Sequence, residues 1–232
     1  MKVQFRVLSD LISHSHKTVF VHVPKCGGQS IETAFLADLG LDWETRAPLL
    51  LRLNDNLRLG PPRLAHLIAR DYARYHYLSD ELFRSYYSFA ILRDPVARTV
   101  SLYNFLLSMG TLPRAMGFDT FLFDWLAKQL QYGQATAEEQ NSPAHGFFFV
   151  RPQVDFIVDM NGAVCVKDVF FLESLGRAYP VIQQKSGLRT SLGHANKSVQ
   201  HFQSAQLDPR HIDFIRELYA ADFDFIGSHT TS

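Results

Sequence analysis

The residues best suited to chemistry on an anion lie in a short loop near the start of the chain. Residues 24–28 read PKCGG, a turn with one cation and two glycines, and Gln29 and Ser30 follow it. Backbone amides in such a loop and at a helix N-terminus point the same way as the helix macrodipole, so together they form an anion site. The glycines let the backbone approach the anion without a Cβ in the way. Lys25 adds positive charge, and Ser30 adds a hydroxyl. The alternative is a plain turn between strand and helix, in which the glycines serve tight packing.

A second set of polar residues lies in residues 88–104, which read SFAILRDPVARTVSLYN. Arg93 comes directly after an apolar run, and Ser101 follows about two helical turns later, at 3.6 residues per turn. A guanidinium that binds phosphate through two hydrogen bonds is the favoured use of Arg93, and an ion pair or a capping carboxylate is its alternative. Arg98 suits either a phosphate ligand or a solvated surface charge.

The elements that must position these residues are strands followed by helices. Thr18–Val23 is an unbroken apolar and β-branched run, which predicts a buried strand of a parallel sheet. Beyond the loop the period becomes helical, and one face holds Ile31, Ala34, Phe35 and Leu39. Ser88–Leu92 predicts a second buried strand, with Arg93 at its carboxyl end, where α/β sheets bind ligands. Asp94 and Pro95 suit the N-cap and first residue of the next helix.

Together, the sequences HVPKCGGQSIE and FAILRDPVARTVSLYN resemble the two phosphosulfate-binding signatures of sulfotransferases. These signatures typically read PKTGGTS and R-[DN]-P followed by R-x-x-S-x-Y, and the match is to the carbohydrate-type group and its small bacterial relatives. In that family the first loop grips the 5′-phosphosulfate of the donor 3′-phosphoadenosine 5′-phosphosulfate (PAPS), and the second holds its 3′-phosphate. The resemblance implies a P-loop-like three-layer α/β fold, with a central parallel β-sheet flanked by helices.

The resemblance also assigns roles to single residues. It places the 5′-phosphosulfate on Lys25, Cys26, Gly27, Gly28, Gln29 and Ser30, and the 3′-phosphate on Arg93 and Ser101. Cys26 and Gln29 stand where the family usually has Thr, so a hydroxyl contact is replaced while the backbone amides remain. A further segment, LGHANKS, resembles the family's H-x-N-x-S loop near the nucleotide, and it adds Asn196, Lys197 and Ser198. A solvated turn is the alternative for this last segment.

The candidate catalytic base is a histidine in a predicted helix, Pro61–Tyr75. His66 lies near the start of this helix, and with Ala69 it resembles the family's segment in which Ala follows His three positions later. An imidazole can take a hydroxyl proton near neutral pH. A capping or packing histidine is the alternative. His76, just after the helix, is the second candidate for the base, and it is also a predicted contact of the acceptor substrate.

The segment QVDFIVDMNGAVCVKDVFFLESL resembles another stretch of the family, in which a Gln precedes a strand, D-x-x-G and a strand that ends in E-x-L. We predict a strand at Val154–Val158, a hairpin turn at Asp159–Gly162 because Asn-Gly suits positive φ, and a return strand at Ala163–Phe171. Gln153 is a predicted substrate contact, and Glu173 a predicted buried partner for a cation.

Two later stretches predict helices. Phe118–Leu130 is amphipathic, and its aromatic residues line either the core or an acceptor pocket. Pro209 opens another helix, with Ile212, Ile215 and Tyr219 inward. Ala220–Gly227 resembles the terminal Y-x-x-D-F sequence of the family.

Length and composition restrict the class of protein that this chain can be. The chain has 232 residues, which suits one α/β domain over residues 1–232, with residues 1–15 as a short strand or a loose arm. Hydrophobic residues make up 47%, which argues against wholesale disorder. The formal net charge is zero, which argues against a general nucleic-acid binder. An anionic ligand needs only a local basic cluster.

The sequence also bears on compartment and metals. Cys26 and Cys165 are too few for a disulfide framework, which favours a reduced intracellular setting. The N-terminal residues hold no apolar segment of signal-peptide length, and no run of about 18 apolar residues occurs, so we expect no membrane span and a cytoplasmic protein. No His/Cys cluster has the spacing of a metal site, and no metal is expected.

The sequence therefore predicts a PAPS-dependent sulfotransferase. It would transfer the sulfuryl group to an acceptor hydroxyl, on a carbohydrate or on another small-molecule or lipid alcohol, and release 3′-phosphoadenosine 5′-phosphate (PAP). Lys25 would stabilise charge on the bridging oxygen, and His66 would accept the proton. One alternative is a P-loop-type nucleotide kinase, which the absent GK[ST] disfavours. The other is a non-catalytic nucleotide-binding protein on the same fold. The acceptor and the oligomeric state are not legible from the sequence.

Overall fold

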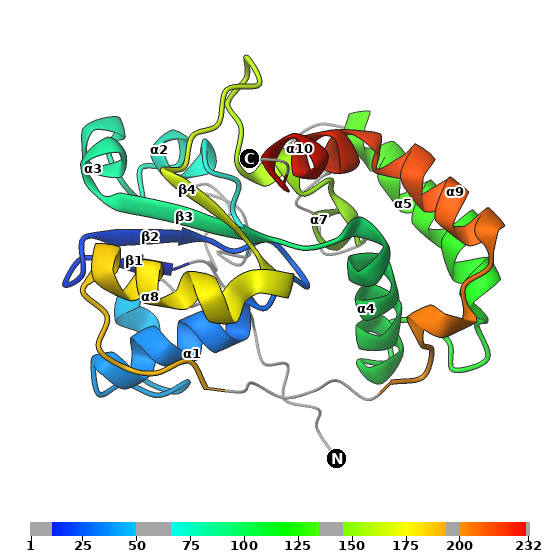
Figure 1. Ribbon diagram of the computed structural model, residues 1–232, viewed down its shortest axis with the longest axis horizontal. Helices are drawn as coiled ribbons and strands as arrows, with labels where there is room; N and C mark the ends of the chain where they lie inside the picture. The colour runs from blue at the N-terminus through cyan, green and yellow to red at the C-terminus, as the bar shows by residue number, and fades with distance from the viewer. Residues whose placement is uncertain (1–10, 50–65, 135–145, 194–199, 231–232) are drawn as a thin grey trace. The chain divides into compact units, whose positions relative to one another are not determined.

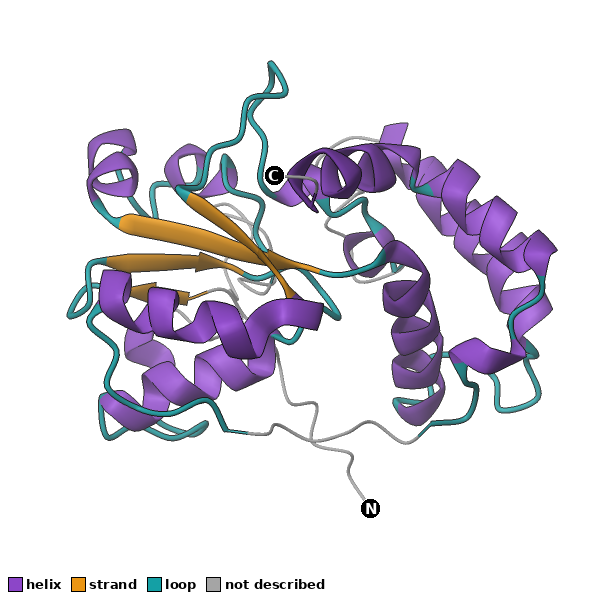
Figure 2. Cartoon of the chain, viewed as in Figure 1, coloured by secondary structure: helices purple, strands orange, loops and turns teal. Residues whose placement is uncertain are grey.

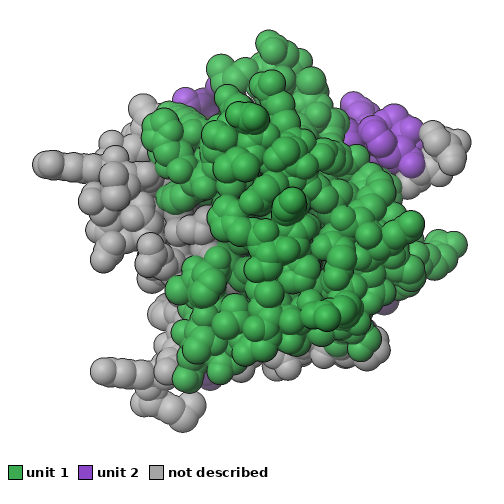
Figure 3. All heavy atoms as spheres, turned by 90° about the vertical axis from the view of Figure 1, so that its left-hand side faces the viewer, with its two compact units in different colours: residues 1–92, 155–195 green, residues 93–154, 196–232 purple. Residues whose placement is uncertain are grey.

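The computed structural model describes residues 11–49, 66–134, 146–193 and 200–230 of the chain (Figure 1). The chain forms two compact units, coloured separately in Figure 3, of which the first comprises residues 1–92 and 155–195 and the second comprises residues 93–154 and 196–232. The chain thus leaves the first unit after its third strand and returns to it for the fourth. One domain over residues 1–232 stays a prediction.

The first unit is built on a four-stranded sheet with the order β1-β2-β3-β4. The short strand β1 (Leu11–Ser13) runs antiparallel to β2 (Thr18–Val21). Strand β2 pairs in parallel with β3 (Tyr87–Leu92), which pairs in parallel with β4 (Asp168–Phe171). Every residue of β2 and β3 is buried, as their unbroken apolar runs predict for strands covered on both faces. The predicted α/β class with a mostly parallel sheet is confirmed.

Helices flank this sheet (Figures 1 and 2). Helices α1 (Gly28–Asp38) and α8 (Leu175–Ser186) lie together on one side, and α2 (Asp71–Arg74) and α3 (Asp80–Ser85) lie on the other. Helix α1 buries three residues of the predicted face, Ile31, Ala34 and Phe35, whereas Leu39 follows the helix and is half-buried. Short 3₁₀ turns of the chain are η1 (Ala47–Leu49), η4 (Val154–Phe156) and η5 (Leu172–Ser174).

The predicted helix Pro61–Tyr75 is wrong over much of its described length. Residues 61–65 lie outside the described residues, and of the rest only α2 (Asp71–Arg74) is helical. His66 has a φ of 64°, which a right-handed helix does not accept. The backbone N–H of Ala69 donates to the carbonyl of Phe156 at 2.7 Å instead of to its own turn. A long-range hydrogen bond therefore replaces the predicted helical one.

The predicted hairpin is confirmed only at its turn. Gly162 has a φ of 80°, and the carboxylate of Asp159 accepts hydrogen bonds from the backbone N–H groups of Asn161 and Ala163. Residues 154–156 form a 3₁₀ turn and not a strand, and the flanks pair only at an isolated bridge between Val158 and Val164. The return strand is limited to β4, because residues 168–171 pair with β3 and extend the sheet.

In its described residues the second unit consists of helices and loops (Figure 2). Its elements are α4 (Pro95–Ser108), the π-helical η2 (Thr120–Leu126), α5 (Ala127–Leu130), η3 (Gln131–Gln134), α7 (Phe147–Val150), η6 (Ser204–Gln206), α9 (Pro209–Leu218) and α10 (Ala220–Thr230). The predicted helix over Phe118–Leu130 is thus present, with a π-helical centre. The side chain of Asp94 caps α4 by accepting the N–H of Ala97 at 2.8 Å, as predicted.

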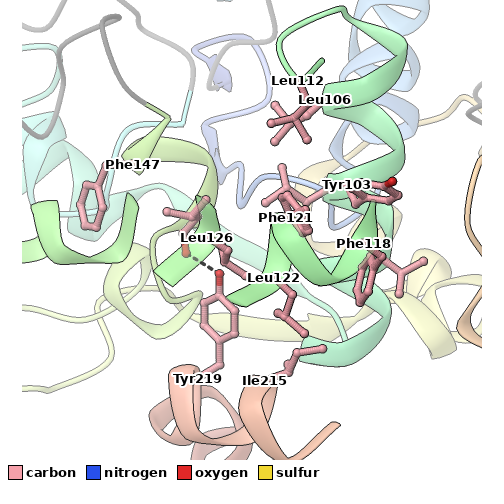
Figure 4. Packing of buried hydrophobic residues seen from close by; sticks show 13 residues of the cluster. Tyr103, Leu106, Leu112, Phe118, Phe121, Leu122, Leu126, Phe147, Ile215 and Tyr219 are labelled. Carbon is pink, nitrogen blue, oxygen red and sulfur yellow. Dashed lines mark hydrogen bonds between the residues drawn. The ribbon is translucent and has the colours of Figure 1, made fainter. Parts of the chain in front are cut away.

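Aromatic and aliphatic side chains form the core of this unit (Figure 4). Phe121 and Leu126 from the predicted helix and Ile215 from α9 are fully buried. Tyr219 is 2% exposed, and its hydroxyl donates to the carbonyl of Val150 at 2.8 Å. In the predicted helix Phe118–Leu130, the aromatic residues Phe118 and Phe121 therefore belong to the core, and Phe123 and Trp125 pack against it.

The described residues contain neither a candidate membrane span nor a candidate metal cluster. None of their helices is long and apolar enough to cross a membrane. Within the same residues, no group of three or more His, Cys, Asp and Glu side chains is placed to hold a metal ion.

Candidate active site

The loop between β2 and α1 has the backbone of an anion site. Lys25 has a φ of 68°, in the left-handed region that a side chain disfavours, and Gly27 has a φ of 81°. Strained backbone at a non-glycine residue is typical of functional sites. Gly27 occupies the N-cap of α1 and offers no side chain to the helix, and the first turn of α1 holds no acidic residue. The first-turn amides and the helix dipole therefore favour a negatively charged ligand.

The side chains of this loop divide into two groups. Lys25, Gln29 and Ser30 are half-buried and reach solvent. Cys26 is 1% exposed, and its Sγ lies 3.5 Å from the carbonyl oxygen of Pro24. The cysteine that replaces the family's Thr thus faces the interior, and only its backbone is left for a ligand.

A buried histidine–glutamate pair, which the sequence analysis missed, lies at the base of this loop. Nδ1 of His22, just after β2, is 2.6 Å from Oε1 of Glu32 in α1, and the two side chains are at most 3% exposed. Burial raises the pKa of the Glu32 carboxyl well above its usual range, while Arg46 opposes this shift. Burial of both side chains therefore shields this hydrogen bond from solvent. A signal existed, since Glu32 lies three positions before Phe35 and seven before Leu39, at the edge of the predicted apolar face.

Both glycines of the loop lie close to a neighbouring side chain, and Gly27 also has a positive φ. A Cβ on Gly28 would overlap the imidazole of His22. A Cβ on Gly27 would lie 2.6 Å from Cδ1 of Leu172. The His22 ring has little room to move, because Glu32 holds its Nδ1 and the ring stacks on Phe20 at a centroid distance of 5.4 Å.

We predict that Gly28→Ala lowers the free energy of unfolding by about 3 kcal/mol, because overpacking a rigid site costs about 1–3 kcal/mol or more. Urea unfolding, followed by circular dichroism, measures the change. Gly176→Ala is the matched control, because Gly176 lies in the first turn of α8 and a Cβ there meets nothing within 4 Å. The control should equal the wild type or exceed it. Equal stability of the two variants would contradict the close approach of His22 to Gly28.

The structure places His66 beside this buried pair. Its Nδ1 lies 2.8 Å from the carbonyl oxygen of His22, and the two imidazole rings meet edge to face with centroids 4.5 Å apart. A carbonyl only accepts, so Nδ1 of His66 donates its proton, and the lone pair of the neutral ring resides on Nε2. His66 is thereby anchored to the residue that supports the loop, in the tautomer a base requires.

Outside the loop, two residues that the sequence analysis singled out in the first unit, His76 and Glu173, are exposed. His76 lies in an exposed turn after α2, with a φ of 59°. Glu173 is exposed, so the prediction that it is buried is wrong. Residues 196–198, predicted to contact the nucleotide, lie outside the described residues.

In the second unit, Arg93 directly follows the end of β3 and is half-buried. Ser101, the predicted partner of Arg93, is half-buried in α4. Arg98 fits neither of its predicted uses. It is 2% exposed, and its guanidinium donates to the carbonyl oxygens of Phe149 and Arg151 at 3.0 Å each. Arg98 therefore satisfies buried carbonyls of its own unit.

Gln153, predicted to contact substrate, is fully buried in the same unit. Its Oε1 accepts the backbone N–H of Arg93 at 2.9 Å, and its Nε2 donates to the Arg93 carbonyl at 2.8 Å. This geometry favours a role in holding Arg93 over a contact with the acceptor.

A mostly parallel sheet and a lysine- and glycine-containing loop that opens a helix together define an α/β protein of P-loop-like architecture. The family model described as the sulfotransferase family matches residues 10–142, which is more than half of the chain and includes the loop, His66 and Arg93. The chain belongs to the sulfotransferase family (sulfotransferase family 2). Comparison with curated proteins gave no match. Comparison with solved structures gave none either.

Proposed function

We propose that the protein transfers the sulfuryl group of PAPS to an acceptor hydroxyl and releases PAP. The observation that carries this proposal is the loop of residues 24–28. It combines a lysine in a strained conformation, a glycine N-cap and a first helical turn without acidic residues. These features suit a bound phosphosulfate, and the family supplies the chemistry of sulfuryl transfer.

The loop would act on the donor through charge and position. Backbone amides at the start of α1 would bind the 5′-phosphosulfate, with help from the side chains of Gln29 and Ser30. Lys25 would neutralise the charge that develops on the bridging oxygen as the bond from sulfur to that oxygen breaks. Such transfers resemble phosphoryl transfer, in which positioning and charge neutralisation do most of the catalysis.

The 3′-phosphate of the donor would be bound by the second signature. Arg93 and Ser101 match the family's Arg and Ser, and they belong to the second unit. A guanidinium can give a phosphate two parallel hydrogen bonds, which a lysine cannot. We propose that residues 196–198 also contact this nucleotide, and only the sequence resemblance supports that contact.

We propose His66 as the base. Nε2 would take the proton of the acceptor hydroxyl while the oxygen attacks sulfur, and Nδ1 would keep its hydrogen bond to the carbonyl of His22.

The acceptor class is a small molecule or a glycan with a hydroxyl group. Cys26 and Cys165 are not joined by a disulfide, and we propose the reducing cytoplasm as the setting.

Calorimetric titration with PAP tests the donor site, with ATP and Mg²⁺ as the comparison. We expect the wild type to bind PAP, and we expect Arg93→Ala to weaken that binding by about 100-fold, since hydrogen bonds to charged groups are worth about 1.5–3 kcal/mol each. Arg114→Ala, an exposed arginine of the same unit, is the control and should bind like the wild type.

The rival functions give different results in this experiment. A nucleotide kinase would prefer ATP with Mg²⁺ over PAP. A non-catalytic relative would bind PAP and release none from PAPS with any acceptor of a panel of sugars and alcohols. No binding of PAP by the wild type would overturn the proposed function.

A further inference from the structure

Arg93 is held through its backbone by an unusual contact. The side-chain amide of Gln153 bonds both the N–H and the C=O of the same residue, at 2.9 and 2.8 Å. Gln153 is fully buried, and 60 positions separate it from Arg93 in the sequence. The amide thus pairs with Arg93 as a neighbouring strand would, and it leaves the guanidinium outside this contact.

Gln153 is fixed in turn by a buried carboxylate. Oδ2 of Asp222 in α10 accepts the backbone N–H of Gln153 at 2.9 Å, and Oδ1 accepts that of Val154 at 3.0 Å. Asp222 is fully buried. Burial raises its pKa, and the charge of Arg98 and the two N–H groups oppose that shift. A buried polar group destabilises the fold unless it is hydrogen-bonded. Both carboxylate oxygens of Asp222 accept hydrogen bonds from the segment that carries Gln153.

A mobile arginine loses side-chain and backbone entropy when it binds a phosphate, so a fixed backbone increases its affinity. The N–H and C=O of Arg93 are held by Gln153, and the next residue, Asp94, caps α4. The start of the Arg93 side chain is therefore fixed from both directions. These contacts lie within the second unit.

We propose that Gln153 and Asp222 are positioning residues that aim the guanidinium of Arg93 at the 3′-phosphate of the donor. This inference rests on the proposed function. It replaces the predicted contact of Gln153 with the acceptor. It also gives Asp222 of the Y-x-x-D-F sequence a role in donor selectivity.

The test compares two nucleotides that differ by the 3′-phosphate alone, PAP and adenosine 5′-monophosphate (AMP). In Gln153→Glu a carboxylate can still accept the N–H of Arg93, but it has no N–H to donate to the Arg93 carbonyl. We expect PAP affinity to fall by about 10- to 100-fold, because an unsatisfied buried group costs about 1–3 kcal/mol. AMP affinity should change less than about 3-fold, which corresponds to under 1 kcal/mol.

Three further variants sharpen the result. Asp222→Asn removes one acceptor and should lower the same ratio of PAP to AMP affinity. Gln153→Glu should have no added effect in an Arg93→Ala background, because the two act on one contact. Gln129→Glu is the matched control. Gln129 is the other buried glutamine among the described residues of this unit, and its Oε1 only accepts the N–H of Gly146 at 3.1 Å.

The outcomes separate the two proposals. If the wild type does not bind PAP, the proposed function fails. If the wild type binds PAP and Gln153→Glu keeps the wild-type ratio of PAP to AMP affinity, the positioning role is wrong. An equal loss for both nucleotides also overturns it, because a purely structural residue would disturb the site without regard to the 3′-phosphate. Circular dichroism shows that each variant is folded.

Discussion

Replacement of Lys25 by alanine is expected to lower the rate of sulfuryl transfer by about 10³-fold, the upper range seen when a group that neutralises charge in the transition state is removed. The proposed role requires a cation at the donor's bridging oxygen, and this loop contains a single cation. Lys25 is half-buried in a strained conformation with a φ of 68°. Release of PAP from PAPS, with an acceptor found by screening, measures the effect.

Lys17→Ala is the matched control for this prediction. Lys17 is an exposed lysine that also has a positive φ, 46°, and it lies outside the loop. The substitution removes the same charge from a comparable backbone, so it reports any general effect of charge or strain. Turnover of Lys25→Ala at the level of Lys17→Ala would remove Lys25 from the mechanism.

The second large effect is expected at His66. His66→Asn should lower kcat by about 10²- to 10⁴-fold, the usual contribution of a general base. Asparagine tolerates the positive φ of this position, and its side-chain N–H₂ can replace the hydrogen bond from Nδ1 to the carbonyl of His22. The fold should therefore survive while the base is lost. KM for PAPS should change little, since the donor is bound by other residues.

The pH profile separates a base from a packing histidine. Wild-type kcat/KM should fall at acid pH, because a protonated imidazole cannot accept a proton and imidazoles change charge between about pH 5 and 8. That acid limb should be absent from the residual activity of His66→Asn. His76→Asn is the comparison, because His76 also has a positive φ but lies in an exposed turn. If His76→Asn shows the larger loss, the base is assigned to the wrong histidine.

Both predictions concern groups that His22 supports. Its ring contacts the position of Gly28 at the start of α1, and its carbonyl accepts the hydrogen bond of His66. The proposed donor loop and the proposed base therefore share one support. A change at His22 should affect both PAP binding and the rate of proton transfer.

Local sequence determined the elements that hold the proposed donor site. The apolar run that becomes β2, the glycine pair and the helical period of α1 are all short-range features, so strand, loop and helix form where they are predicted. Asp94 and Pro95 likewise begin α4, since capping and a preset φ act within one turn. The fold class and this order of strand, loop and helix could be predicted for this reason.

Only the tertiary structure decided how the buried polar residues are used. Glu32 pairs with His22, Gln153 holds Arg93, and Asp222 holds the segment of Gln153 from 69 positions away. Arg98 is buried and donates hydrogen bonds to carbonyl groups of its own unit. In the segment after His66, the N–H of Ala69 donates to the carbonyl of Phe156 where a helix is predicted. A polar side chain is stable in the interior only if it finds a partner. The partner is chosen by packing between distant segments, and a local pattern does not contain that choice.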